Sequence, residues 1–306
     1  MLLAVILLLL IVFVFLVCNQ LYIDRIIPDR SLMRTDLQFK NYKDRIRLLV
    51  LGDSFPASAV NPEFLPNSFN LACSAETYEQ TYLKMRKVLN EKNSVRVILM
   101  PLDIHSFARY RDHYLFSHVW YWSHYASYSE LSRLMKTSRF ALFIKSKFPV
   151  LGFSLRWIAR KPAIIIRGWR RYDKTFAVSK TRREEAREVL AMQFKEYKDI
   201  DAGFWDVFLR IIDLALAKGK RVVLIKYPLT ESYFDEFKKY YDIKPKEFYG
   251  IIKKRLAKYK NIKILDYQKA FLDDALFADP IHMNVQGAEL FTKRLARDLK
   301  RLRIAS

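Results

Sequence analysis

The sequence predicts an α/β domain built on a doubly wound, parallel sheet of five strands with helices on both faces, in three layers. Short apolar runs recur along the chain at residues 48–51, 69–71, 95–100, 222–225 and 262–265. Helical patterns separate most of them, at residues 76–90, 182–194, 204–218 and 245–258. Strands that alternate with helices favour a parallel sheet with right-handed crossovers.

The first apolar run is predicted to form a central strand of the sheet. Residues 48–51 are all apolar and Gly52 follows them, which suits a strand that is buried on both faces. In a sheet of order 2-1-3-4-5, the carboxyl end of this strand lies beside the point where the strand order reverses. Ligands of open α/β sheets bind at that edge.

Polar residues follow this first strand and precede the last helix. Asp53 and Ser54 come directly after Gly52, and a serine on such a turn becomes a nucleophile when a base takes its proton. Asp279 and His282 stand three residues apart before a helical pattern that carries Leu290, Phe291, Leu295 and Leu299 on one face. That spacing lets the carboxylate orient the imidazole.

Gly52-Asp53-Ser54 early in the chain and Asp279-x-x-His282 before the final helix resemble the first and last blocks of the SGNH/GDSL hydrolase superfamily. The resemblance covers roughly residues 45–300 and implies a flavodoxin-like sheet. It also implies that Ser54 is the nucleophile, His282 the base and Asp279 its partner. The amides of Ser54 and Ala75 would then form the oxyanion hole, since Ala75 stands at the last glycine position of the second block.

The third block departs from the family pattern. Residues 100–103 read Met-Pro-Leu-Asp, where the family has Gly-x-Asn-Asp, so one side-chain donor of the oxyanion hole is missing. This departure points to the membrane-tethered branch of the superfamily, which is associated with O-acylation of cell-surface polysaccharides. It equally permits an inactive protein. Asp53, Asp103 and His105 are expected at the same sheet edge and are candidate substrate contacts.

The N-terminus is apolar and uncharged. Residues 2–17 form an unbroken apolar run, and with residues 18–23 they are long enough to cross a bilayer. We interpret residues 1–23 as a single-pass anchor, residues 24–44 as a juxtamembrane linker and residues 45–306 as the α/β domain. A cleaved signal peptide is the alternative, although no basic segment precedes the run and no small-x-small site follows it.

The side of the membrane is open to two interpretations. Arg25, Arg30 and Arg34 follow the span, so the positive-inside rule places the domain in the cytoplasm. The family resemblance places it outside the cytoplasm, and we expect an extracytoplasmic domain.

We expect a helical insertion at about residues 105–181, since this stretch is too long for a plain crossover. It is rich in aromatic and basic residues, namely Tyr110, Tyr114, Phe116, Trp120, Tyr121, Trp122, Tyr125 and Tyr128, then Arg156, Trp157, Arg160, Lys161, Arg167, Trp169, Arg170 and Arg171. Three interpretations remain open: a helical cap, a surface that lies on anionic headgroups, and a carbohydrate groove.

The composition indicates no cofactor, metal or nucleic acid. Cys18 and Cys73 provide no disulfide framework, and His113, His118 and His124 lack ligand spacing. The net charge of +22 and the pI near 9.9 suit nucleic acid, but no binding motif accompanies them, and a basic surface beside a membrane anchor explains them equally well.

The sequence therefore favours a membrane-tethered serine esterase or O-acyltransferase that acts on acyl esters, expected to be acetyl esters, of a cell-surface polysaccharide. It does not distinguish hydrolysis from transfer. The alternative is an inert anchored scaffold that binds glycan or a membrane-bound acyltransferase. A lipid-ester hydrolase on the cytoplasmic leaflet follows if the charge rule sets the orientation.

Overall fold

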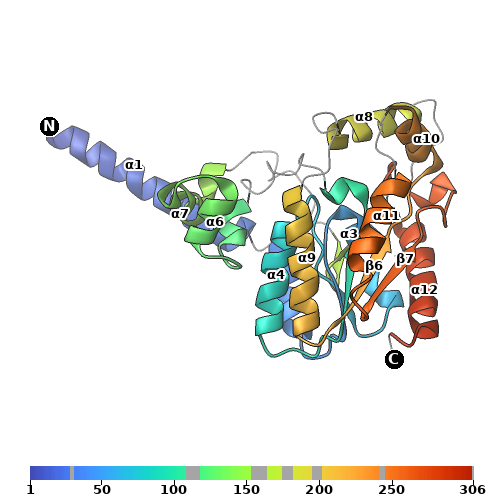
Figure 1. The fold of residues 1–306 in the computed structure, drawn as a ribbon. Coiled ribbons are helices and arrows are strands. Elements are labelled where there is room, and N and C mark those ends of the chain that lie inside the picture. The colour runs from blue at the N-terminus through green and yellow to red at the C-terminus, as the bar shows by residue number, and fades with distance from the viewer. Residues whose placement is uncertain are drawn as a thin grey trace. The chain divides into compact units, whose positions relative to one another are not determined.

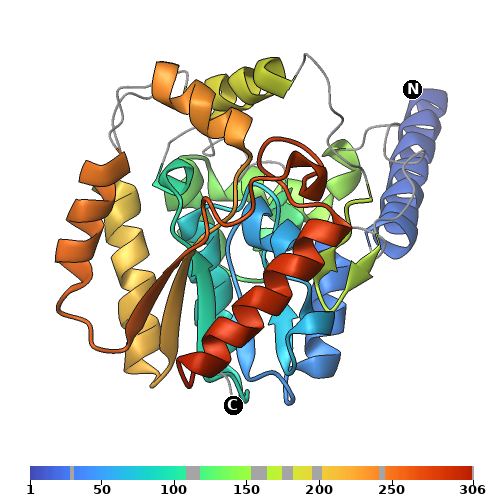
Figure 2. The same ribbon diagram turned by 90° about the vertical axis from the view of Figure 1, so that its right-hand side faces the viewer.

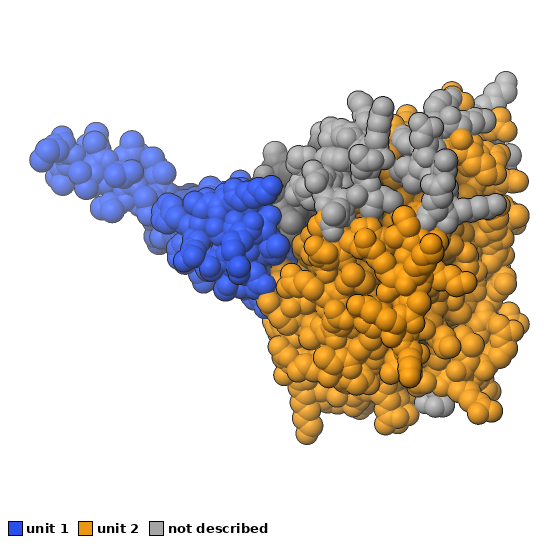
Figure 3. All heavy atoms as spheres, in the orientation of Figure 1, with its two compact units in different colours: residues 1–37, 113–163 blue, residues 38–112, 164–306 orange. Residues whose placement is uncertain are grey.

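The computed structural model describes residues 1–27, 31–107, 118–152, 164–173, 182–194, 202–240 and 245–304. The chain divides into two compact units (Figure 3): unit 1 contains residues 1–37 and 113–163, and unit 2 contains residues 38–112 and 164–306. Some residues named above lie outside the described part of the chain, namely Arg30, Tyr110, His113, Tyr114, Phe116, Arg156, Trp157, Arg160 and Lys161.

Unit 2 is built on a parallel sheet. Within the described residues the sheet has five strands in the order β2-β1-β3-β6-β7, which confirms the predicted 2-1-3-4-5 arrangement (Figures 1 and 2). The strands are β1 Leu48–Val50, β2 Ser68–Asn70, β3 Val97–Pro101, β6 Arg221–Lys226 and β7 Ile262–Asp266. In the register, Leu49 stands between Phe69 and Ile98.

Helices cover both faces of this sheet, so the predicted three-layer α/β fold is confirmed. One layer contains α4 Tyr78–Asn90, α9 Ala202–Ala217 and α11 Pro245–Leu256; α4 contacts α9, and Trp205 of α9 contacts Phe248 of α11. The other contains α3 Ser54–Ala59 and α12 Val285–Arg301, which contact each other (Figure 1). The remaining elements of this unit are α8 Arg182–Phe194, α10 Glu231–Tyr240, η2 Pro62–Phe64, η3 Ile104–Phe107 and η7 Asp274–Leu276.

The core lies where the apolar runs meet. Leu49, Val50, Ile98 and Val223 are fully buried, because the inner strands β1, β3 and β6 are covered by a helical layer on both sides. On α12 the side chains of Phe291, Leu295 and Leu299 are buried at helical spacing, as predicted.

A short hairpin was not predicted. It consists of β4 Ile165–Ile166 and β5 Trp169–Arg170, inside the stretch expected to be a helical insertion. The amide of Asn70 donates to the carbonyl of Arg167 at 2.9 Å, so the turn of this hairpin lies against the end of β2. Gly168 has φ +85°, and an added Cβ would overlap the carbonyl of Asn70. Only glycine fits this close approach.

Unit 1 is helical in its described part. It contains α1 Leu2–Leu21, η1 Tyr22–Ile26, α5 Val119–Trp122, α6 Tyr128–Met135, α7 Arg139–Lys147 and η5 Pro149–Gly152. Helix α2 Ser31–Tyr42 includes the division at residue 37. The stretch Leu2–Ile26 is long and apolar enough to cross a membrane, a property that signal sequences share. Tyr121 and Tyr125 donate to the carboxylate of Asp36 at 3.0 and 2.5 Å.

The turn after β1 should require glycine at position 52, because a side chain there has no space. This residue has φ +117°, and an added Cβ would overlap the ring of Pro101. Gly52→Ala is expected to lower the free energy of unfolding by about 2–4 kcal/mol, from positive φ and overpacking together. Gly219→Ala is the matched control, because Gly219 has φ +68° and nothing within 4 Å of its Cβ position. It should cost only about 1 kcal/mol.

Both values can be measured by urea unfolding of the full-length protein in detergent, followed by circular dichroism. Equal losses for the two variants would contradict the proposed close contact between Gly52 and Pro101.

Candidate active site

Ser54 lies at the carboxyl edge of the sheet, as predicted. Gly52 ends β1, and Asp53 caps α3 by accepting the amide of Phe55 on Oδ1 at 2.9 Å. Aspartate is a strong N-cap, so the sequence Gly-Asp-Ser makes a sharp turn from strand to helix. Ser54 is the first residue of that helix and is partly exposed.

Asp279 and His282 form a hydrogen-bonded pair. Oδ1 of Asp279 accepts the amides of Ile281 and His282, both at 3.0 Å. Oδ2 lies 2.7 Å from Nδ1 of His282. Burial alone would raise the pKa of Asp279, but the hydrogen bond and charge of His282 outweigh it and hold this pKa below its ordinary value. An ionised carboxylate only accepts, so the proton of a neutral His282 lies on Nδ1 and Nε2 is left as the base.

The ring of His282 is held between two aromatic side chains. Tyr172 is parallel to it at 5.9 Å between ring centroids, and Phe55 meets it edge-on at 6.1 Å. Phe55 is the residue after Ser54, so the structure brings the last block of the chain next to the serine turn. Tyr172 reaches this place because the carbonyl of Tyr172 accepts the amide of Val285 at 3.0 Å.

No hydrogen bond joins the hydroxyl of Ser54 to His282. Nε2 of His282 is buried and has no hydrogen-bond partner among the described residues. In enzymes without bound substrate, catalytic hydrogen bonds are often long or poorly aligned, and they tighten when substrate binds. The roles of Ser54, His282 and Asp279 as a triad therefore remain a prediction.

Side-chain hydrogen bonds of Asn70 connect the loop after β2 to α3, the helix that begins with Ser54. Its Nδ2 donates to the carbonyls of Pro56 and Val60 at 2.7 and 2.8 Å, and its Oδ1 accepts the amide of Ala72 at 3.1 Å. The amide of Cys73 donates to the carbonyl of Gly52 at 2.9 Å. Residues 71–76 therefore lie directly beside the turn that carries Ser54.

Ala75 has φ +60°, in the left-handed region. The SGNH/GDSL pattern that the sequence resembles has glycine at this place. Glycine adopts the left-handed region freely, whereas other residues lose about 1–2 kcal/mol there. Ala75 thus has a backbone conformation that is typical of glycine, although its own side chain makes that conformation unfavourable. The oxyanion role of the Ala75 amide remains a prediction.

A buried ion pair supports the same loop. Nζ of Lys84 lies 2.5 Å from Glu76 and donates to the carbonyl of Leu71 at 2.9 Å, while Thr81 donates to Glu76 at 2.8 Å. Burial raises the pKa of Glu76, although Lys84 opposes the shift. The two ends of residues 71–76 are joined through this network, which nothing in the sequence indicated.

Asp53, Asp103 and His105 lie together beneath the serine turn. Oδ2 of Asp53 is 3.1 Å from both Nε2 of His105 and Oγ of Ser106, and the ring of His105 lies 4.1 Å from that of Phe55. Asp53, Asp103 and His105 are each at most 2 % exposed. Burial, and then the charge of Asp53, hold the pKa of Asp103 well above its ordinary range. Contact of these residues with substrate remains a prediction.

A cavity of about 330 Å³ lies at the opposite end of the sheet. It is lined at the amino ends of the strands by Arg47, Arg96, Arg221 and Lys300, over the apolar side chains of Leu48 and Val97. It contains none of the candidate catalytic residues. Among the described residues no group of three or more His, Cys, Asp or Glu side chains could hold a metal ion.

The chain is similar in structure to GDSL-type acylhydrolases. One is a candidate acylhydrolase from Bacteroides fragilis, with 12% identity, a TM-score of 0.41 and coverage of 84% of this chain and 87% of that chain. A GDSL-like lipase from Bacteroides thetaiotaomicron has 9% identity, a TM-score of 0.40 and coverage of 86% and 90%.

A third similar structure is a candidate lipolytic protein of the G-D-S-L family from Desulfitobacterium hafniense. It has 11% identity, a TM-score of 0.39 and coverage of 82% of this chain and 98% of that chain. No protein-family model and no curated protein sequence matches the chain.

The left-handed conformation of Ala75 leads to a prediction about stability. Ala75→Gly should raise the free energy of unfolding by up to about 1 kcal/mol, because the strain at positive φ disappears. Ala72→Gly is the control in the same loop, since Ala72 is buried and has no positive φ. It should lower the free energy of unfolding by about 0.5–1 kcal/mol through lost backbone restriction. Urea unfolding of both variants measures the two signs, and a loss of stability in Ala75→Gly would contradict the assigned strain.

Proposed function

We propose that this chain is a membrane-anchored serine enzyme that acts on acyl esters, with Ser54 as nucleophile, His282 as general base and Asp279 as the group that orients it. One observation carries the proposal. Asp279 fixes the Nδ1 side of His282 at 2.7 Å, while Nε2 stays without a partner among the described residues, beside Phe55. This is the arrangement that a serine hydroxyl needs in order to lose its proton.

In this mechanism Oγ of Ser54 attacks the ester carbonyl carbon and its proton passes to Nε2 of His282. The tetrahedral intermediate collapses, the C–O bond to the alcohol breaks, and the alcohol takes the proton from His282. Water or a sugar hydroxyl then attacks the acyl-serine, giving its proton to His282, and Ser54 regains a proton as it leaves. The amides of Ser54 and Ala75 stabilise the oxyanion in each step.

The missing asparagine of the third block limits the rate. Leu102 stands in its place and is fully buried, so no side-chain amide reaches the oxyanion from there. Loss of one such donor costs about 10²–10³ in kcat in other acyl-transfer enzymes. We therefore expect slow turnover of simple esters and faster reaction with a substrate that supplies further binding contacts.

The proposal also includes a membrane span at the N-terminus that is retained in the mature protein. Asn19 near the end of α1 is buried, and its Nδ2 donates to the carbonyl of Lys147 at 3.0 Å. The rings of Phe15 and Phe148 lie 5.5 Å apart. A signal peptide is cleaved off, so specific contacts between it and the mature chain are not expected. The contacts of Asn19 and Phe15 therefore support a retained membrane span. We propose that the enzyme domain lies on the extracytoplasmic side.

The side chains next to His282 support a polysaccharide substrate. The guanidinium of Arg170 lies 5.2 Å from the ring centroid of Tyr172, which itself stacks on His282. Both side chains are partly exposed. A partly exposed guanidinium this close to the proposed base suits a sugar that carries an acidic group, because arginine pairs with carboxylates through charge-assisted hydrogen bonds. We propose O-acylated surface polysaccharide as the substrate, with a membrane-bound acyltransferase as the partner that would supply acyl groups in the transfer reaction.

The direct test is hydrolysis of p-nitrophenyl acetate by the full-length protein in detergent. Ser54→Ala should lower kcat/KM by at least about 10³-fold, because the nucleophile is gone. Ser58→Ala is the control in the same helix. Its Oγ donates to the carbonyl of Phe55 at 3.1 Å and is buried, so its loss affects stability and not the reaction.

Circular dichroism should show that both variants are folded. Equal rates for Ser54→Ala and the unchanged protein would refute the serine mechanism and favour the inert scaffold.

A further inference from the structure

The outer face of α7 in unit 1 is apolar and basic. Leu142 is buried beneath the helix, while Phe140, Phe143 and Lys147 fall on the opposite side at helical spacing. Phe140 is 74% exposed and Leu151, in the following η5, is 61% exposed. Large apolar side chains that are exposed together mark an interaction surface in a folded protein. We call Phe140, Phe143, Phe148 and Leu151 the apolar patch.

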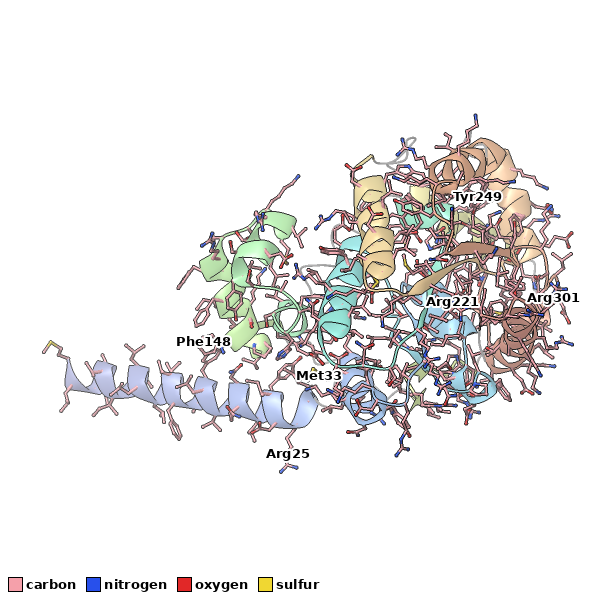
Figure 4. The ribbon with its side chains drawn as sticks, turned by 60° about the horizontal axis from the view of Figure 1, so that its bottom comes forward. Arg25, Met33, Phe148, Arg221, Tyr249 and Arg301 are labelled. Carbon is pink, nitrogen blue, oxygen red and sulfur yellow. The ribbon has the colours of Figure 1, made fainter. Side chains whose placement is uncertain are left out.

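Contacts with α1 fix the position of this patch. Asn19 of α1 bonds to the carbonyl of Lys147, and the ring of Phe15 contacts that of Phe148. Figure 4 shows Phe148 against α1, with Arg25 projecting from the other side of the helix. Element η5 also contacts both α1 and η1. The patch therefore begins at the C-terminal third of the apolar helix.

The depth of this contact follows from helix geometry. The apolar stretch from Leu2 to Cys18 is about 26 Å long at a rise of about 1.5 Å per residue, close to the hydrocarbon thickness of about 30 Å. The edge of the hydrocarbon thus falls near Asn19 when α1 spans a bilayer. Phe15 lies about 6 Å inside that edge, since it precedes Asn19 by one turn. Phe148, in ring contact with Phe15, therefore lies at a similar depth, just inside this edge.

The charge of this segment suits lipid headgroups. Residues 128–152 contain one acid, Glu130, and five basic residues: Arg133, Lys136, Arg139, Lys145 and Lys147. Aromatic side chains next to lysine and arginine are typical of the membrane–water interface, where the rings enter the acyl boundary and the cations meet phosphates. Anionic lipids attract such a segment further.

We propose that α7 and η5 lie in the headgroup region of the leaflet at the C-terminal end of α1, with the apolar patch at the acyl boundary and Arg139, Lys145 and Lys147 on anionic headgroups. Unit 1 is then an interfacial module and not only a tether. The proposal rests on the membrane anchor of the proposed function and is independent of the ester chemistry.

The test uses the full-length protein with Cys18→Ala and Cys73→Ala, reconstituted in nanodiscs of phosphatidylcholine with phosphatidylglycerol. Phe140→Cys and Leu151→Cys each carry a nitroxide label, and power saturation compares its accessibility to oxygen and to a water-soluble nickel complex. Leu272→Cys in unit 2, where Leu272 is 49% exposed, is the reference for a label in water. Val12→Cys in α1 is the reference for a label in the bilayer.

We expect the oxygen-to-nickel ratio at positions 140 and 151 to exceed that at position 272 severalfold and to fall below that at position 12. Ratios at 140 and 151 equal to that at 272, with a lipid-like ratio at 12, would overturn the interfacial module and leave the anchor intact. A water-like ratio at 12 would overturn the anchor and the module together. Removing the phosphatidylglycerol should lower the ratio at 140 and 151, and an unchanged ratio would overturn the role of the cations.

Discussion

The close approach of β1 and β3 at Gly52 is the constraint on which the candidate site depends. A residue with a side chain would overlap the ring of Pro101, and the positive φ of Gly52 turns the chain at once into α3. Asp53 then caps the helix and is itself held by His105. The backbone on both sides of Ser54 is held in place, because the carbonyl of Gly52 accepts the amide of Cys73 and the side chain of Asp53 accepts the amide of Phe55. The buried apolar strands provide the rigid frame for this turn.

The Asp279–His282 pair belongs to the C-terminal part of the chain, and one helix contact positions it near Ser54. Thr292 of α12 donates to the carbonyl of Ala59 at the end of α3, and its Oγ1 accepts the amide of Asn61 at 2.9 Å. Asn284 caps α12 by accepting the amide of Gly287 at 3.0 Å, so the helix begins at Val285, three residues after His282. Packing of α12 on α3 therefore brings the Asp279–His282 pair to the serine turn.

Local patterns predicted the strands and most helices, because burial produces a regular spacing of apolar residues along the sequence. The strand order and the meeting of Ser54 with Asp279 and His282 were expected from the flavodoxin-like arrangement that the family resemblance implies. Local patterns did not predict the stacking of Tyr172 on His282 or the buried Glu76–Lys84 pair. The first contact joins residues distant in sequence, and the second joins a loop residue to the following helix, so neither produces a regular pattern in the sequence. The left-handed φ of Ala75 was also invisible, since alanine does not mark that conformation as glycine does.

The central claim is that His282 activates Ser54, although no hydrogen bond joins them without substrate. A fluorophosphonate probe tests it most directly, since it reacts only with an activated hydroxyl. The full-length protein should form an adduct on the peptide that contains Ser54, detected by mass spectrometry, and His282→Gln should abolish it. No adduct on that peptide, or an equal yield from His282→Gln, would contradict the account.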